Sequence, residues 1–123
     1  MKIKKVFSFD GYEYNVIVSD GQQELMCACF PCHCEPQIGM EIEEIHAEPI
    51  DDAMRIDEEE YLIKEVIVEG ERHAYYMRGR VINTSKPMIA ISGFTIELET
   101  HLAKDIKQGE FVEFKVGRLD CFI

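Results

Sequence analysis

The sequence of 123 residues contains no apolar run that approaches the length of a membrane-spanning helix. Residues 1–11 begin with lysines, as a signal peptide does, but they lack the apolar stretch and the small-residue cleavage site that a signal peptide carries. These two absences predict a cytoplasmic protein with no membrane partner. Thiols stay reduced in that compartment, so the cysteines are expected to be reduced.

Basic residues are scarce relative to acidic residues. The chain has 13 lysines and arginines against 24 aspartates and glutamates, which gives a net charge of −11. Residues 41–72 hold thirteen of the acids and only three of the bases, so the excess is concentrated in the middle of the chain. Binding to nucleic acid depends on lysine and arginine, which replace the counterions of the phosphates. A nucleic-acid partner is therefore disfavoured.

The sequence also lacks the short motifs of common enzyme sites. It has no glycine-rich phosphate loop, no nucleophile elbow and no His-Glu-x-x-His pattern. The motifs therefore give no support for catalysis, and no cofactor is expected. A hydrophobic fraction of 46% nevertheless indicates a packed core rather than a disordered chain.

What the sequence does contain is a series of short segments in which apolar and polar residues alternate, as they do in β-strands. Asp10-Gly11 and Asp20-Gly21 separate the first three segments, and an Asp-Gly pair supplies the positive φ angles of a tight hairpin turn. The expected strands cover residues 3–9, 12–18, 22–30, 40–45, 61–68, 74–82, 88–91, 94–98 and 111–116.

This pattern predicts an all-β fold, an antiparallel meander that closes into a small OB-like barrel or a sandwich. The connection 49–60 is the one segment that admits a short helix, because aspartates at its start suit the helix dipole. A weak likeness between 12–42 and 75–112 suggests a duplicated half-domain. We expect a single compact domain with two β halves, about 1–48 and 61–123, joined by the acidic connection.

Four of the five cysteines lie within residues 27–34, which read Cys-Ala-Cys-Phe-Pro-Cys-His-Cys. In the strand expected over 22–30, Cys27 and Cys29 share one face with Leu25. Cysteine packs as a small hydrophobe and is often buried. Burial in a covered strand therefore explains Cys27 and Cys29 without further chemistry.

Cys32, His33 and Cys34 need another explanation, because Pro31 and Pro36 break the strand and favour an exposed loop. Thiolate and imidazole are ligands that zinc prefers, so zinc binding is the first alternative. However, a structural zinc site usually joins two distant Cys-x-x-Cys units, and the second unit is missing here. A third interpretation is a redox pair formed by Cys29 and Cys32. It has less support than zinc binding, because no long helix follows whose dipole would lower the pKa of a thiol. The candidate metal ligands are Cys27, Cys29, Cys32, His33 and Cys34.

The second alternative is that a barrel face in the C-terminal part binds single-stranded nucleic acid. Aromatic residues interleave there with cations, as stacking platforms and phosphate contacts do in such binders. Alternating aromatics are, however, more commonly the core face of a strand. The candidates are Tyr75, Tyr76, Arg78, Arg80 and Arg118.

Taken together, these patterns favour a non-catalytic β-barrel binding module. The segment 25–30 is apolar on both faces, which indicates a strand that is covered either inside the domain or by another chain. We therefore expect the partner to be another protein or a second copy of this chain. Zinc binding and nucleic-acid binding stand as the two alternatives.

Overall fold

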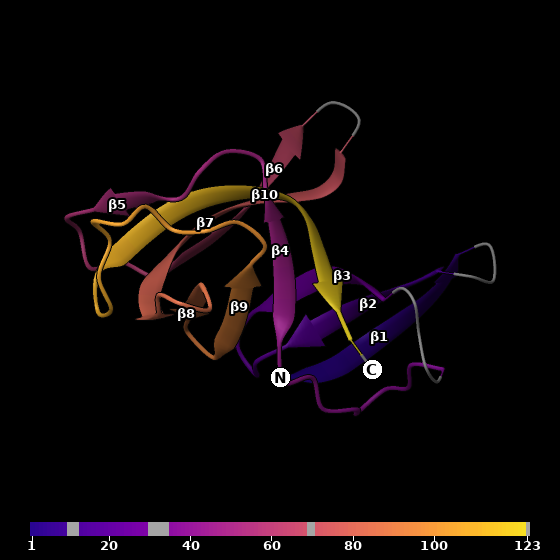
Figure 1. Ribbon diagram of the computed structural model, residues 1–123. Coiled ribbons are helices and arrows are strands. Elements are labelled where there is room, and N and C mark those ends of the chain that lie inside the picture. The colour runs from indigo at the N-terminus through magenta and orange to yellow at the C-terminus, as the bar shows by residue number, and fades with distance from the viewer. Residues whose placement is uncertain (10–12, 30–34, 69–70, 123) are drawn as a thin grey trace.

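The computed structural model describes residues 1–9, 13–29, 35–68 and 71–122. Within these residues the chain forms ten strands and no helix, which confirms the all-β prediction (Figure 1). Accordingly, no helix among them is long and apolar enough to cross a bilayer. In chain order the strands are β1 (Lys2–Phe9), β2 (Glu13–Ser19), β3 (Glu24–Cys29), β4 (Ile45–Pro49), β5 (Met54–Ile56), β6 (Leu62–Val68), β7 (Glu71–Asn83), β8 (Met88–Ile91), β9 (Phe94–Leu98) and β10 (Phe111–Cys121).

Five of the strands close into a barrel, in the order β7, β8, β9, β4, β10 and back to β7. The pairs are antiparallel except for β4 with β9, which is parallel. In an OB barrel the first strand pairs with the second and fourth, and the third and fifth form the parallel pair. The strands β7 to β10 thus correspond to the first four OB strands and β4 to the fifth. The small OB-like barrel is confirmed, although its fifth strand comes first in this chain.

The long strand β7 pairs with three other strands. Its N-terminal part pairs with β6 and β10, and its C-terminal end pairs with β8. Gly79 pairs with Val112 of β10, and a Cβ atom on it would come within 2.5 Å of Ile91 Cγ1 and 2.7 Å of the Ala90 carbonyl oxygen. The close approach of β7 to β8 therefore requires a residue without a side chain.

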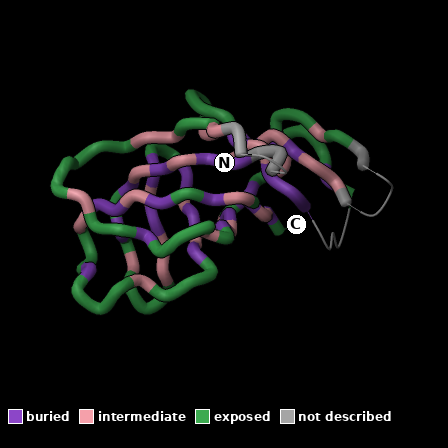
Figure 2. The backbone as a smooth tube through the Cα atoms, turned by 90° about the horizontal axis from the view of Figure 1, so that it is seen from above, coloured by how far each residue is buried: buried purple, intermediate pink, exposed green. Residues whose placement is uncertain are grey.

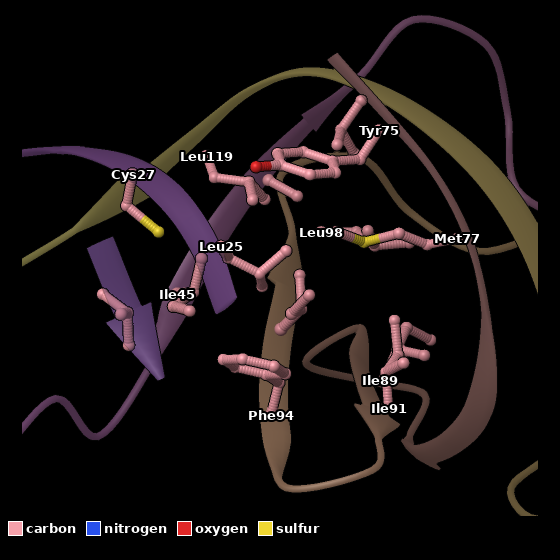
Figure 3. Close-up of a cluster of buried hydrophobic side chains, with 14 of the residues drawn as sticks. Leu25, Cys27, Ile45, Tyr75, Met77, Ile89, Ile91, Phe94, Leu98 and Leu119 are labelled. Carbon is pink, nitrogen blue, oxygen red and sulfur yellow. The ribbon is translucent and has the colours of Figure 1, made fainter. Parts of the chain in front are cut away.

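The strands β1, β2 and β3 form an antiparallel meander beside the barrel (Figure 1). The buried residues of β2 and β3 include Val16, Val18 and Leu25. Figure 2 shows the backbone coloured by burial, with the buried residues in purple. Figure 3 shows Leu25 in a cluster of buried side chains with the barrel residues Phe94 and Ile45. All of these side chains belong to one hydrophobic cluster, so the meander and the barrel share a core.

Backbone contacts also join the meander to the barrel. Within the described residues, β3 meets β10 through a parallel bridge between Ala28 and Asp120. The backbone N–H of Met26 donates to Tyr75 Oη of β7 at 3.0 Å. Tyr75 is 6% exposed, and burial raises the pKa of its hydroxyl, which therefore stays neutral and accepts this hydrogen bond.

Asp20 fixes the turn after β2 and reaches across to the barrel. One carboxylate oxygen accepts hydrogen bonds from the backbone N–H groups of Gln22 and Gln23, and the other accepts from Gly93 at 3.1 Å. Burial alone would raise the pKa of Asp20, but these backbone N–H groups lower it below its ordinary value. A Cβ atom on Gly93 would lie 2.8 Å from the Cβ of Asp20, so this approach also needs glycine.

The short helix that the connection 49–60 admits is not formed. The connection contains the strand β5, which pairs with Phe111–Glu113 of β10. Ala53 is buried and Ile56 is half-buried beside this pairing. The hydrogen bonds to the edge of β10 thus stabilise a strand in this connection more than two aspartates at its start stabilise a helix.

The prediction of a strand over residues 40–45 is also wrong, because β4 begins only at Ile45. The preceding residues instead cover the outer edge of β1. The backbone N–H of Ile3 donates to the Met40 carbonyl oxygen at 2.9 Å, and that of Ile42 donates to Met1 at 2.8 Å. Ile42 is buried by this contact, so its place in the alternating pattern reflects a covering segment rather than a regular strand.

Candidate functional site

The first two cysteines of the cluster lie in the hydrophobic core. Cys27 and Cys29 are 1% and 0% exposed on β3, as the alternation of the strand predicts. Burial, with smaller effects of Cys121 and Asp120, raises the pKa of Cys27 well above its ordinary value. A thiol that keeps its proton is a poor metal ligand, because the ligand is the thiolate. The other three candidates, Cys32, His33 and Cys34, lie outside the described residues, so zinc binding by this segment stays a prediction.

The nucleic-acid candidates do not form one exposed basic surface. Tyr75 is buried in the barrel, where its ring is not available for base stacking. Arg118 Nε donates to Asp120 at 2.7 Å near the end of β10. The remaining three lie on the outer surface of β7, where Arg80 is exposed and Tyr76 and Arg78 are half-buried.

The charge of Arg78 is balanced by acidic neighbours. Its guanidinium lies 2.8 Å from Glu60 and 3.2 Å from Glu113, and its Nε donates to Tyr76 Oη at 3.1 Å. The guanidinium also lies over the Tyr76 ring, 5.7 Å from its centre. The hydrogen bond to Tyr76 is the main cause that raises the pKa of Arg78. A phosphate would have to displace two carboxylates to reach this cation.

The structure brings together four titratable side chains that lie in separate parts of the sequence pattern. His46 points outward from β4, and Glu97 is its neighbour on the parallel strand β9. Glu44 lies two residues before His46, and Lys86 comes from the turn between β7 and β8. We call Glu44, His46, Lys86 and Glu97 the charged tetrad.

Nitrogen-bearing side chains and carboxylates alternate around the charged tetrad. Lys86 Nζ lies 3.1 Å from Glu44 Oε1 and 3.4 Å from Glu97 Oε1. The second oxygens of the same carboxylates face the imidazole. Glu97 Oε2 lies 3.1 Å from His46 Nδ1, and Glu44 Oε2 lies 3.5 Å from His46 Nε2. Each carboxylate oxygen of the tetrad therefore faces a nitrogen atom.

The contact between Lys86 and Glu44 favours the charged forms of both groups. The hydrogen bond from Lys86 is the main cause that lowers the pKa of Glu44 below its ordinary value. In turn, hydrogen bonds to Glu44 and Glu97 raise the pKa of Lys86. The ammonium and the carboxylate thus stabilise each other's charge, although the exposure of Lys86 to solvent screens this attraction.

His46 offers a nitrogen atom to a carboxylate on each side of its ring. A neutral imidazole has one N–H group and one lone pair, and only the protonated ring donates from both nitrogens. A lone pair turned toward a carboxylate oxygen would be repelled. A metal ion between the lone pair and the carboxylate would relieve this repulsion. The edge of the Phe122 ring packs against the imidazole, with ring centres 4.7 Å apart.

The position of the tetrad on the barrel resembles that of ligand sites in OB folds. Such barrels bind ligands on the outer surface of their second and third strands and at the loops beside them. Glu97 lies on the strand that corresponds to the third, and Lys86 lies in the loop before the second. This correspondence is an analogy of fold alone, because similar barrels carry many functions.

The two end strands of the sheet differ in how their outer edges are covered. At one end, backbone hydrogen bonds from residues 39–42 cover the start of β1. At the other end is β6, which pairs with β7 and with no third strand among the described residues. Its side chains Leu62, Ile63 and Val66 are half-buried, while Lys64 and Glu65 are exposed. The edge of β6 is thus an open hydrogen-bonding surface with apolar residues on both faces.

Comparison with family models, curated proteins and solved structures finds no match to this chain. The correspondence with the OB arrangement therefore rests on strand pairing and carries no family assignment.

Proposed function

We propose that the protein is a non-catalytic binding module that takes an extended segment of another protein as an added strand on β6. One observation carries this proposal: β6 ends the sheet, and no further strand of the described chain covers its outer edge. An added strand gains backbone hydrogen bonds from such an edge, and alternate side chains supply specificity. The same property makes uncovered edges prone to pair with other chains.

The surroundings of β6 favour a basic partner segment. The connection before β6 carries four exposed acids in succession, Asp57 to Glu60, and Glu65 is exposed on the strand itself. Complementary charge accelerates association and excludes partners of the wrong sign. A second copy of this chain would bring its own four acids of residues 57–60 with its β6 strand. Repulsion between the two acidic connections therefore disfavours pairing of β6 with itself.

A direct test uses a fluorescein-labelled peptide of about ten residues in which valine and lysine alternate, long enough to cover the strand. We expect its fluorescence anisotropy to rise on binding and the effect to weaken with added salt. A matched peptide that alternates valine and glutamate is the control and should not bind. Equal binding of the two peptides, or concentration-dependent dimerisation of the protein without either, would contradict the proposal.

Two proline variants locate the binding edge. Successive residues of a strand direct their backbone N–H groups to opposite neighbours, so one of Lys64 and Glu65 donates to β7 and the other points outward. Proline removes the N–H group. One of the variants Lys64→Pro and Glu65→Pro therefore breaks a hydrogen bond to β7 and should melt at a lower temperature than the natural chain. The other removes only the outward N–H group and should keep the natural melting temperature. This second variant should lose peptide binding, and unchanged binding would show that the peptide does not pair with the β6 edge.

Zinc binding by the cysteine segment has a separate test. Metal content is measured on protein purified without added metal, for the natural chain and for a Cys32→Ser, Cys34→Ser variant. A structural site retains its metal through purification. The hypothesis therefore requires close to one equivalent of metal per chain in the natural protein and none in the variant. A metal content under about a tenth of an equivalent in the natural chain would exclude it.

Nucleic-acid binding is tested with a fluorescent single-stranded oligonucleotide at low ionic strength. Contacts with phosphates release counterions, so true binding weakens steeply as salt is added. The alternative requires binding that Arg80→Gln reduces, because Arg80 is the exposed cation among the candidates on β7. No salt-dependent binding at low ionic strength would exclude the alternative.

A further inference from the structure

We propose that Glu44, His46 and Glu97 form a binding site for a divalent transition-metal ion such as Zn²⁺, which Lys86 occupies with its ammonium group when no metal is bound. The site is separate from the cysteine segment and from the β6 edge. Its three side chains come from the residue before β4 (Glu44), from β4 (His46) and from the neighbouring strand β9 (Glu97).

The geometry of the three side chains suits one ion. One ligand atom from each, a carboxylate oxygen or an imidazole nitrogen, lies within 4.8 Å of the other two. Bonds of about 2.0–2.2 Å to a tetrahedral zinc ion place ligand atoms roughly 3.4 Å apart. One separation, 3.1 Å from Glu97 Oε2 to His46 Nδ1, is already close to this value. The 3.5 Å contact of Glu44 Oε2 is to the other ring nitrogen, Nε2, so Glu44 has to rotate toward an ion that binds at Nδ1.

The charge of the tetrad also suits a divalent ion. The ammonium of Lys86 already lies between the two carboxylates, 3.1 Å from Glu44 Oε1 and 3.4 Å from Glu97 Oε1. A divalent ion that displaces this ammonium brings two positive charges to the two carboxylates, so neither is left without a compensating charge in its partly buried position. Glu97 is the more shielded of them, with 14% of its side chain exposed.

The donor set selects the class of metal. An imidazole nitrogen with two carboxylate oxygens suits zinc and similar first-row ions, whereas Mg²⁺ and Ca²⁺ prefer oxygen donors and a larger number of them. Three protein ligands leave a coordination position for water, as in catalytic rather than structural zinc sites. The strand pairing of β4 with β9 fixes the spacing of His46 and Glu97.

Lys86 is the natural competitor for the site, and this makes the proposal testable. Its side chain is 52% exposed and extends from a turn, so it can leave without disturbing the barrel. If Lys86 competes with the metal, Lys86→Met should bind zinc more tightly than the natural chain. If the tetrad is an ion-pair network alone, the same change leaves two carboxylates with no measurable gain in zinc affinity.

The experiment measures zinc affinity by competition with a chromophoric chelator in the natural chain and in single variants. We expect Lys86→Met to raise the affinity and Glu97→Gln and His46→Gln to lower it by at least about tenfold, since loss of even an indirect partner costs that much. Glu48→Gln is the matched control, because Glu48 is exposed further along β4 and outside the tetrad. Melting temperatures without metal verify that each variant folds.

Substitution with Co²⁺ separates this site from the cysteines. A thiolate ligand gives cobalt a strong charge-transfer band in the near ultraviolet, and an imidazole–carboxylate site does not. We expect binding without this band, and retained in a variant that replaces Cys32 and Cys34 by serine. Zinc affinity that Lys86→Met and Glu97→Gln leave unchanged, or binding that disappears with the cysteines, would overturn the proposal.

Discussion

The barrel and the meander β1 to β3 are stabilised in different ways. Each strand of the barrel has a hydrogen-bonded neighbour on both sides, because the ring closes on itself. The meander has no such closure and is joined to the barrel by a shared core, by the bridge of β3 to β10 and by the contacts of Tyr75 and Asp20. We infer that the barrel is the stable unit and that the meander depends on being docked to it. Four changes test this difference, in order of decreasing effect.

The largest effect is expected in the core of the barrel. Phe94 on β9 is 1% exposed and lies on the inner face, so Phe94→Ala leaves a cavity that the closed ring cannot collapse. We expect the free energy of unfolding to fall by about 3–5 kcal/mol, measured by urea denaturation. The neighbouring Thr95→Ala faces outward and is the control, with an expected change within about 0.5 kcal/mol. Similar losses in the two variants would mean that the barrel interior is not the main source of stability.

Leu25→Ala makes the equivalent change on the meander side of the core. Leu25 is 0% exposed on β3, and we expect a loss of about 2–5 kcal/mol. Native-state hydrogen exchange should show where the loss falls, because β2 and β3 can open while the barrel stays closed. If the amides of the barrel strands exchange faster by the same factor as those of β2 and β3, the two regions unfold together. That result would contradict the proposed difference in stability.

Tyr75→Phe removes one hydrogen bond between the two regions and leaves the ring in place. Met26 then lacks the acceptor for its backbone N–H, and we expect a loss of about 1 kcal/mol. The amide of Met26 should exchange faster with solvent, as measured by NMR. Tyr76→Phe is the matched control, since Tyr76 lies on the outer surface of the same strand and contacts Glu113 instead. If Tyr76→Phe also accelerates exchange at Met26, the effect is not due to docking.

The smallest effect is a dependence on pH that originates at Asp20. Its pKa is lower in the folded protein than its ordinary value of 3.8, so the carboxylate stabilises the fold above that pH. This contribution should be lost as the pH falls through the lowered folded value. Asp20→Asn, which keeps an acceptor oxygen but no charge, should flatten this part of the curve of unfolding free energy against pH. An unchanged acid limb would show that the charge of Asp20 does not contribute to docking.

Alternation in the sequence is sufficient to predict most of the strands, because one face of each is buried. On β9, for example, Phe94, Ile96 and Leu98 are buried and the residues between them are not. The two errors share a cause. Around Ile42 and in the connection 49–60, the outcome depends on which strand edge is available for pairing, and alternation contains no information about edges.

The charged tetrad could not be found in the same way. Glu44 and His46 are spaced for one face of a strand, which is a weak signal that many surface strands share. Glu97 reaches them only through the parallel pairing of β4 with β9, and Lys86 only through the turn that precedes β8. Long-range register of this kind follows from the closed barrel and not from any local pattern. The cysteine cluster is a much stronger sequence signal, yet its first two members are core residues.

The place of β4 in the ring has a consequence for folding. Its two neighbours, β9 and β10, both lie far beyond it in the chain, so the ring cannot close until the last strand has been synthesised. Closing such a long loop is entropically costly, and folds dominated by distant contacts reach the native state slowly, on the order of milliseconds to seconds. Until then the apolar face of β3 has no barrel to pack against. A nascent chain of this protein is therefore expected to depend on chaperones more than its small size suggests.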